Sequence, residues 1–505
     1  MRRNSFLLNH AEFDFEDGER RTISFLGENA DQDNTHITII AGANGTSKSR
    51  LVANIVEQFC EINNAQRDKP KDSRRYQRDV AQGLTCTGFS TFRNRQLSQY
   101  STLLDQFSPS LDKNGVLRDR HVALPSRVLV LSNLVMDKFH FQKDGSTDDQ
   151  FYHYLGVRQS SNLTTTGSVE RSVSEALIDI VADRQRLDLF RSWLELVFPG
   201  GRELAFEFPR LSRSNISKFL EAKNRTEFIK LRIERPAGNV MRNVTDETIE
   251  KTTNDITELF EFLDGNLSDY DTSSLNARQK SRLFLRLATL TDTQAAKFAR
   301  LIPCFSSAQR AGFSSWPSLC FEAKSWLPFH QLSSGEQNLL SVGAKLISHA
   351  RPGCFVAIDE PEVSLNVAWQ QKYTDLIWNS LAQATGSHVL IATHSPHLIS
   401  SLPKGKASLI TIQKNNEELL FKTHDALFEG WGAESVLYQV LGITSASSHL
   451  FYRDLATVLH HIQEGGTDRT LLDGFLEKAN RLNFARVEPL EIVISEVVAY
   501  VKGLP

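Results

Sequence analysis

The feature that most constrains this chain is a short apolar segment that runs into a glycine-containing loop and then into a helical pattern. Residues 37–41 are β-branched or small and mostly apolar, which predicts a buried strand. Residues 42–49 read GANGTSKS, and apolar side chains then recur at helical spacing over residues 51–59. A strand, a glycine loop and a helix in this order predict an α/β fold in which the loop opens a helix.

The loop follows the pattern G-x-x-x-x-G-K-[ST] except at Ser47, where the pattern has glycine. In such a loop backbone N–H groups hold phosphates, Lys48 reaches the β- and γ-phosphates, and the Ser49 hydroxyl binds Mg²⁺. Glycine adopts torsions that other residues resist, so Ser47 lowers the expected nucleotide affinity or turnover. A plain Gly/Asn turn is the alternative, which the strand–loop–helix context disfavours. The predicted nucleotide contacts are Gly42, Asn44, Gly45, Thr46, Ser47, Lys48 and Ser49.

Two later apolar segments also end in polar residues. Residues 354–358 run straight into Asp359 and Glu360, and a buried strand that ends in carboxylates is costly unless the charges are used. Asp359 is suited to bind Mg²⁺ together with Ser49, and Glu360 is suited to act as general base on water. His394 follows the apolar residues 389–392 and could contact a γ-phosphate or the attacking water. A single histidine at a strand end is usually structural, so His394 counts only with the other motifs.

A further motif, LSSGEQ at residues 332–337, opens a helical pattern. A serine followed by glycine at a helix start offers a hydroxyl, free N–H groups and the positive end of the helix dipole, which together suit an anion. Taken alone, this motif is more often a helix cap with a carboxylate in the first turn. Ser333, Gly335 and Glu336 are therefore predicted as nucleotide contacts only as part of the whole set.

Taken together, the motifs resemble the ABC ATPase superfamily in the branch of SMC, Rad50 and RecF proteins. Residues 42–49 resemble its Walker A motif, 332–337 its signature motif, and Asp359 with Glu360 its Walker B motif with the catalytic glutamate. Residues 362–366 resemble the D-loop, and His394 resembles the switch histidine. The family's Q-loop glutamine has no counterpart in residues 132–139, where Ser132 and Asn133 remain open as substitutes.

The resemblance implies ATP and Mg²⁺ as cofactors and hydrolysis of ATP to ADP and phosphate. It also implies a homodimer or higher oligomer in which Ser333 and Gly335 of one copy cover ATP held by Lys48 and Ser49 of the other. Catalysis would then consist of positioning and electrostatic stabilisation of phosphoryl transfer.

The predicted fold class is an α/β ABC-ATPase head, a mixed sheet with flanking helices, interrupted by a mostly helical insert and followed by a helical C-terminal region. Amphipathic stripes over residues 173–198, 255–263 and 282–302 support the helical insert. The expected units are residues 1–64 with Walker A, an insert over 65–325 that begins with a basic loop and has a strand near 126–133, residues 326–415 with the remaining motifs, and a helical region over 416–505.

The string IDEPEVSLN, the short insert and residues 431–437 resemble the small AAA15-type ATPases of bacterial anti-phage systems, nearest to the PtuA ATPases of Septu and of retron-linked versions. This implies a regulatory subunit that acts with an HNH nuclease of the PtuB type, and with nucleic acid or a retron reverse transcriptase as further partners. No HNH pattern and no Toprim cluster occurs in the chain itself. A RecF- or Rad50-like DNA-repair ATPase and a nucleotide-stabilised scaffold with little hydrolysis remain alternatives.

Composition narrows the setting. The five cysteines are scattered without a CxxC pair, which argues against a zinc site or a disulfide framework and fits a reducing bacterial cytoplasm. The N-terminus lacks the apolar run of a signal peptide, and no stretch of about 18 apolar residues predicts a membrane span. Net charge is −3, so any nucleic-acid contact requires a local basic patch.

Overall fold

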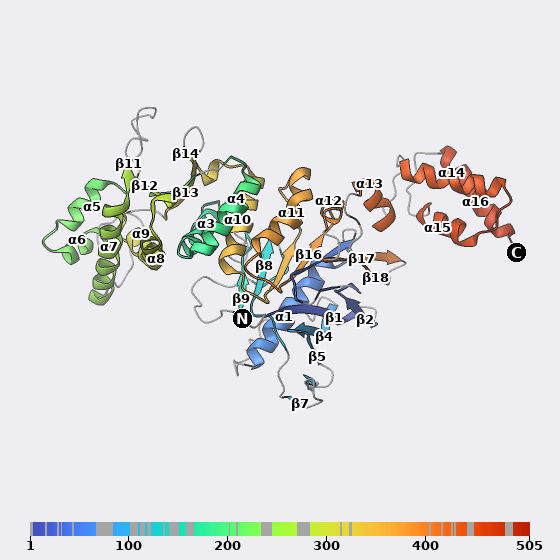
Figure 1. The fold of residues 1–505 in the computed structure, drawn as a ribbon, viewed down its shortest axis with the longest axis horizontal. Helices are drawn as coiled ribbons and strands as arrows, with labels where there is room; N and C mark the ends of the chain where they lie inside the picture. The colour runs from blue at the N-terminus through green and yellow to red at the C-terminus, as the bar shows by residue number, and fades with distance from the viewer. Residues whose placement is uncertain are drawn as a thin grey trace.

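The computed structural model describes most of the chain. The described residues are 4–15, 18–27, 30–31, 33–42, 45–66, 84–101, 110–111, 117–118, 123–134, 137–140, 151–157, 166–200, 203–208, 211–233, 245–269, 283–313, 316–322, 326–402, 406–415, 418–425, 428, 431–441, 449–479 and 488–504. Within them the strands form sheets of seven, five, four and two strands. Figure 1 shows the seven-stranded sheet at the centre, helices α5–α9 toward one end of the molecule, and helices α14–α16 at the other.

The central sheet has the strand order β18-β17-β3-β16-β15-β8-β9, and only β18 runs antiparallel to its neighbour. Its strands are β3 (His36–Gly42), β8 (Val128–Ser132), β9 (Tyr152–Tyr154), β15 (Phe355–Asp359), β16 (His388–Thr393), β17 (Ala407–Asn415) and β18 (Glu418–Asp425). Central parallel strands are covered on both faces, which explains their nearly continuous apolar sequences.

Alternate residues of these strands enter two separate cores. Ile37 and Ile39 of β3 face one layer of helices, whereas Ile40 faces the opposite layer. The first layer consists of α3 (Thr166–Val181), α4 (Arg184–Val197), α10 (Ser334–His349), α11 (Val367–Ser380) and the short α12 (Pro396–Ile399). Trp193 of α4 lies against Gly343 of α10, where an added Cβ would approach the indole ring to 2.4 Å.

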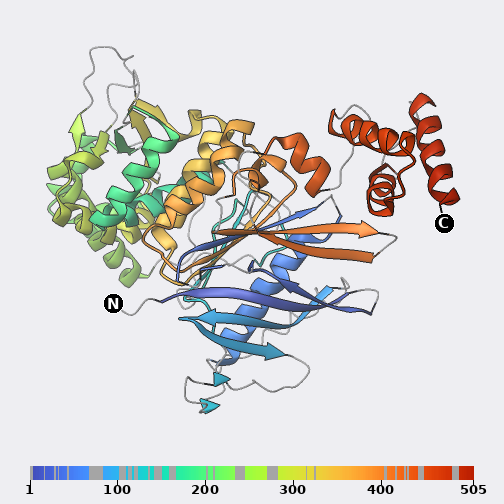
Figure 2. The same ribbon diagram turned by 45° about the vertical axis from the view of Figure 1, so that its right-hand side comes forward.

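The second layer holds α1 (Lys48–Gln66) between the central sheet and an antiparallel sheet of order β2-β1-β4-β5 (Figure 2). Its strands are β1 (Phe6–Phe15), β2 (Arg20–Ser24), β4 (Leu84–Arg93) and β5 (Gln96–Ser101), and the small pair β6 (Ser110–Leu111) and β7 (Leu117–Arg118) follows. β4 and β5 show that the basic loop predicted after residue 64 is replaced by strands over residues 84–101, whereas residues 67–83, which carry most of its basic side chains, lie outside the described residues. β4 pairs with β1, which lies far away in sequence, and β5 pairs with β4.

The insert is not purely helical, because it contains an antiparallel sheet of order β11-β12-β10-β13-β14. The strands are β10 (Leu204–Glu207), β11 (Ser268–Asp269), β12 (Leu283–Arg286), β13 (Ser318–Glu322) and β14 (Trp326–Pro328). The helices and 3₁₀ turns packed with it are α5 (Arg213–Leu220), α6 (Arg225–Ile233), α7 (Asp246–Asn266), η4 (Leu287–Thr289), α8 (Asp292–Arg300), α9 (Ile302–Arg310) and η5 (Phe329–Gln331). The stripe over residues 282–302 is thus a strand followed by helix, because β12 pairs with β10.

The C-terminal region also differs from the prediction of helix from residue 416 onward. Residues 418–425 form β18, which extends the central sheet by pairing with β17. Helical structure begins later, with α13 (Ala433–Ser435), the π-helical turn η6 (Val436–Val440), α14 (His449–Gln463), α15 (Arg469–Ala479) and α16 (Glu488–Gly503). α14–α16 share a small apolar core of their own. No helix among the described residues is long and apolar enough to cross a membrane.

Candidate nucleotide site

The predicted site residues of β3, β15 and β16 meet at one edge of the central sheet. Parallel pairing places Ala41 beside Thr393, and Asp359 beside Ala392 on one side and Ser132 on the other. The carboxyl ends of parallel strands in an open α/β sheet are where ligands bind. Sequence motifs separated by hundreds of residues are therefore gathered into one place.

The loop between β3 and α1 needs left-handed backbone at two positions. Gly45 has φ +83°, which suits glycine, and Ser47 has φ +63°, which does not suit an L-residue. A Cβ at Gly42 would lie 2.7 Å from the carbonyl oxygen of Ile412, so glycine is required there by close approach. Thr46 is buried. Asn44 lies outside the described residues.

Lys48 and Ser49, the first two residues of α1, join the loop to β15. The ammonium group of Lys48 donates to the carbonyl oxygen of Gly42 at 2.9 Å and lies 4.0 Å from a carboxylate oxygen of Glu360. Burial lowers the pKa of Lys48, and the nearby carboxylates oppose that shift. The hydroxyl of Ser49 donates to Oδ1 of Asp359 at 2.7 Å.

The pair Ser49 and Asp359 fits a divalent cation. Burial, above all other causes, raises the pKa of Asp359 to about 6. Its Oδ2 is buried and has no hydrogen-bond partner among the described residues. A hydroxyl beside a partly unsatisfied carboxylate is an all-oxygen donor set of the kind that Mg²⁺ prefers.

Glu360 and His394 lie beside this pair. Nδ1 of His394 is 2.6 Å from Oε2 of Glu360 and 3.2 Å from Oε1 of Glu362. The backbone of Glu360 is left-handed at φ +47°, an uncommon conformation that occurs at functional sites. Burial first, and the Glu362 carboxylate second, raise the pKa of Glu360 to about 8.

The signature-like segment caps α10. Ser333 accepts from the backbone N–H of Glu336, and the Glu336 carboxylate accepts from the backbone N–H and the hydroxyl of Ser333. This is the capping box that the sequence allowed as the alternative interpretation. A Cβ at Gly335 would lie 2.9 Å from the carbonyl oxygen of Ser364, so the capped helix end packs closely on the turn after β15. Ser333 itself is exposed.

The structure adds one acidic residue, Asp137, to which the sequence analysis gave no role, and it gives specific contacts to Glu362, the first residue of the D-loop-like segment 362–366. Glu362 lies beside His394, as described above. Asp137 follows β8, accepts a hydrogen bond from the hydroxyl of Tyr154 and one from the backbone of Phe139 at 3.1 Å, and contributes to the raised pKa of Asp359. Ser132, one of the two open Q-loop substitutes, uses its hydroxyl to accept from the backbone of Leu134. An acidic residue shortly after the apolar residues 128–131 was the available sequence signal for Asp137.

A parallel sheet, a phosphate-loop connection into α1 and a Ser–Asp pair at the strand edge define an ATPase domain of the P-loop class. Residues 37–400 match the family described as "AAA domain, putative AbiEii toxin, Type IV TA system", and since this is more than half of the chain, the protein belongs to that family. No curated protein matches the sequence.

Solved structures show weaker similarity. Two are Smc head domains bound to C-terminal parts of ScpA, one of them derived from Pyrococcus furiosus, each with 12% identity over 83% of this chain and 98% or 96% of theirs, at TM-scores of 0.30 and 0.31. A third is the ADP conformation of an ATP-binding cassette of an ABC transporter, with 11% identity over 89% of this chain and 98% of that one, at a TM-score of 0.27. The predicted fold class, an α/β head with flanking helices, is confirmed by the strand order of the central sheet itself.

Proposed function

We propose that this chain binds ATP with Mg²⁺ at the edge of the central sheet and hydrolyses it. The observation that carries the proposal is the contact of Ser49 with Asp359, whose second oxygen is buried without a partner among the described residues. Lys48 and the loop from Gly42 to Ser47 would hold the phosphates. Mg²⁺, when bound by Ser49 and Asp359, supplies positive charge next to the phosphate oxygens.

In this proposal Glu360 takes the proton of the attacking water, and His394 holds that carboxylate or the γ-phosphate in place. A general base works best when its pKa lies near the operating pH, and the raised pKa of Glu360 meets that condition. Proton transfer of this kind contributes about 10²–10⁴-fold to a rate.

We also propose that two copies close head to head, with Ser333 and Gly335 of one copy over the ATP of the other. Two exposed segments support this arrangement: Ser333 and Ser334 before Gly335, and Asn366 and Val367 after Ser364, where Gly335 packs closely on the carbonyl oxygen of Ser364. Val367, the first residue of α11, keeps 48% of its surface exposed there.

At the level of the cell, we propose a regulatory subunit of a bacterial anti-phage complex that acts with an HNH-type nuclease, as the likeness to Septu ATPases implies. The family description, which names a putative toxin of type IV toxin–antitoxin systems, supports a role of this general kind. Co-expression with a PtuB-type nuclease and co-purification with and without ATP would test it, and lack of association in both conditions would remove the partner from the proposal.

A nucleotide-stabilised scaffold with little hydrolysis is the second candidate. It is favoured by Ser47, whose positive φ strains the loop that must shape itself around phosphates. In that case binding and assembly would occur, but turnover would be slow.

Glu360→Gln separates the two candidates. For an ATPase, the variant should lose at least about 100-fold in turnover and accumulate as an ATP-bound dimer, since only the general base is removed. Turnover is measured by phosphate release, and size by light scattering with Mg²⁺ and ATP. Glu207→Gln, which changes a buried glutamate of β10, is the control and should behave as the native protein. Binding and assembly without turnover in both native and variant proteins would favour the scaffold, and absence of ATP binding would end both proposals.

A further inference from the structure

Glu362 is a buried carboxylate in the turn between β15 and α11, and only 8% of its surface is exposed. Its Oε1 accepts a hydrogen bond from the hydroxyl of Thr393 at 2.6 Å and another from the backbone N–H of His394 at 2.9 Å. The same oxygen lies 3.2 Å from Nδ1 of the His394 ring. One oxygen atom of Glu362 thus contacts the end of β16, the following peptide and the side chain of His394.

Oε1 of Glu362 accepts both of these hydrogen bonds from that segment, whereas Oε2 is buried without a geometric hydrogen-bond partner among the described residues. Burying a carboxylate with one unsatisfied oxygen costs free energy, and packing alone would favour an apolar side chain at this position. The position therefore indicates a task for the charge rather than a contribution to the core.

The segment after β16 is held from a second direction as well. The backbone N–H of Ser395 donates to the hydroxyl of Thr393 at 3.0 Å, and the hydroxyl of Ser395 donates to Oε1 of Gln370 at 2.7 Å. Gln370 in turn donates to the carbonyl oxygen of Leu365 at 2.9 Å. Residues 393–395 are therefore linked to the turn after β15 twice: directly through Glu362, and through Gln370 to Leu365.

The His394 ring itself needs such a support. Half of its side-chain surface is exposed, whereas Glu360 is 13% exposed. A half-exposed ring on a strand end has several rotamers available, and only a fixed peptide and a second carboxylate keep Nδ1 at 2.6 Å from Glu360.

We propose that Glu362 is a positioning residue: it fixes the backbone of Thr393 and His394 and the orientation of the His394 ring, so that His394 and Glu360 face the same reacting water. The positioning role concerns the protein without nucleotide. Its consequence for catalysis rests on the proposed ATPase function. Glu362 does not contact the phosphates in this scheme; its positioning role runs through His394 and is separate from its effect on the pKa of Glu360.

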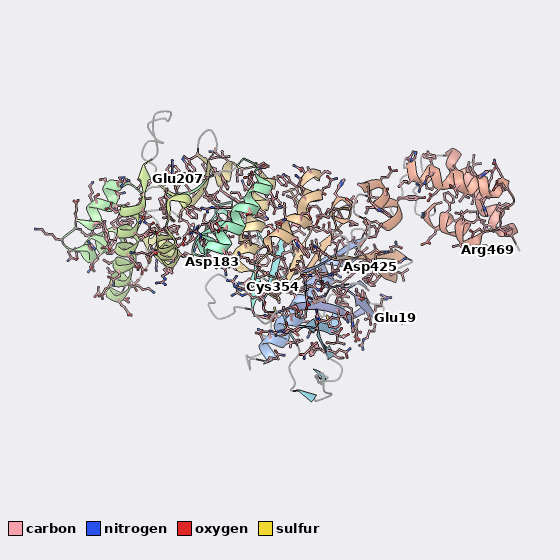
Figure 3. All side chains as sticks on the ribbon, in the orientation of Figure 1. Glu19, Asp183, Glu207, Cys354, Asp425 and Arg469 are labelled. Atoms are coloured by element: carbon pink, nitrogen blue, oxygen red, sulfur yellow. The ribbon has the colours of Figure 1, made fainter. Side chains whose placement is uncertain are left out.

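Hydrogen exchange of the nucleotide-free protein, read by mass spectrometry, tests the positioning. In Glu362→Ala, amides of residues 393–395 should exchange at least about tenfold faster, since a hydrogen bond to a charged group is lost. Amides inside β15 should keep their native rates. Glu362→Gln retains an acceptor oxygen and should give a smaller change. Glu207→Ala is the matched control: Glu207 is 6% exposed, and Figure 3 shows it on the insert, at the other end of the molecule from Arg469 and away from Asp425 of β18.

ATP turnover tests the consequence. Glu362→Gln should lower kcat at least about tenfold with KM changed less than about twofold, because the loss is in the reacting geometry. In a His394→Ala background the same change should have almost no further effect, since both variants remove one function. Native exchange rates at residues 393–395 in Glu362→Ala would overturn the proposal. Multiplicative losses in the double variant would also overturn it. If the native protein does not turn over ATP, the proposed ATPase function fails, and the exchange result still decides the positioning.

Discussion

The nucleotide edge of the central sheet and the core of the insert are both buried, yet they are built in opposite ways. Lys48, Asp359 and Glu362 are buried at the edge, and Ser47, Glu360 and Ser364 have left-handed backbones there. The insert core is instead an aromatic cluster of Phe219, Phe228, Phe260 and Phe313, whose ring centroids are 5.1 to 6.2 Å apart.

The difference indicates how stability and function are divided. Buried charges and strained torsions lower the stability of the nucleotide-free protein, and they persist where the surroundings hold them for a task. Stacked and edge-to-face rings gain free energy beyond the area that they bury. Substitutions in the insert core should therefore change stability, and substitutions at the edge should change the response to nucleotide.

Phe313→Ala in the insert is expected to have the largest effect. The ring is 1% exposed, stacks on Phe228, meets Phe219 and Phe260 edge to face, and lies 4.1 Å under the guanidinium of Arg232. Removing it should lower the free energy of unfolding by about 3–5 kcal/mol. Urea unfolding followed by tryptophan fluorescence measures the loss. ATP affinity below the unfolding transition should stay native, and a changed affinity would break the division between the two regions.

Lys48→Ala should change the response to nucleotide and leave the stability of the nucleotide-free protein nearly unchanged. A ligand present at 100 times its dissociation constant stabilises a protein by about 2.7 kcal/mol, and this gain should vanish in the variant because the phosphates lose their cation. Thermal unfolding with and without Mg²⁺ and ATP measures the gain. A native response of Lys48→Ala to ATP would show that the loop is not the nucleotide site.

A buried histidine joins the head sheets and should make stability depend on pH. His388 accepts from the backbone N–H of Leu8 at its Nδ1, at 2.9 Å. Its Nε2 lies 2.9 Å from the hydroxyl of Thr38, which itself donates to the carbonyl oxygen of Phe25. His388 is therefore neutral with its proton on Nε2. Burial, and secondarily His36, lower its pKa well below 6.5.

Because the folded pKa is depressed, the unfolded chain takes up the proton first as the pH falls. The stability that the neutral His388 contributes is thus present above pH 6.5 and is lost below it. The free energy of unfolding should fall by about 2 kcal/mol from this cause between pH 7 and pH 5. His388→Gln should remove this part of the acid destabilisation, whatever its own stability at pH 7. Urea unfolding of both proteins at the two pH values measures the difference, and equal pH dependences would contradict the assignment.

The sequence predicted the nucleotide edge better than the insert, for physical reasons. A buried apolar strand that ends in Asp359 and Glu360 is an unusual local pattern, and parallel strands bring such ends together. β10 and β13 are four and five residues long and pair across more than 100 residues. Such short strands show no local hydrophobic periodicity from which they could be predicted. The amphipathic pattern around β12 was therefore interpreted as helix.

Asp137 was missed, and the contacts of Glu362 were not predicted, for a related reason. Each is an acidic residue shortly after a strand, and its partners, Thr393 and Tyr154, come from the neighbouring strands β16 and β9. The sequence shows that a carboxylate is present, but it does not show which side chain of a neighbouring strand will contact it. By contrast, the motif itself showed that Ser47 stands where glycine is expected. The structure confirms that this position has a positive φ, which is the reason glycine is preferred there.

Ser47→Gly should have the smallest effect and the most direct bearing on the scaffold alternative. A left-handed L-residue costs about 1–2 kcal/mol, which glycine avoids. Glycine also gives the unfolded chain more conformational entropy, which offsets part of that gain. The free energy of unfolding should therefore rise by about 1 kcal/mol. Arg95→Gly is the matched control: it relieves φ +66° in the β4–β5 turn but loses the ion pair of the exposed Arg95 guanidinium with Asp33, whose side chain is 15% exposed, so its gain in stability should be the smaller of the two. Both variants should gain stability in urea, whereas ATP turnover should rise in Ser47→Gly alone. If turnover stays unchanged while stability rises, Ser47 strains the loop without limiting hydrolysis, and the case for a scaffold loses its structural support.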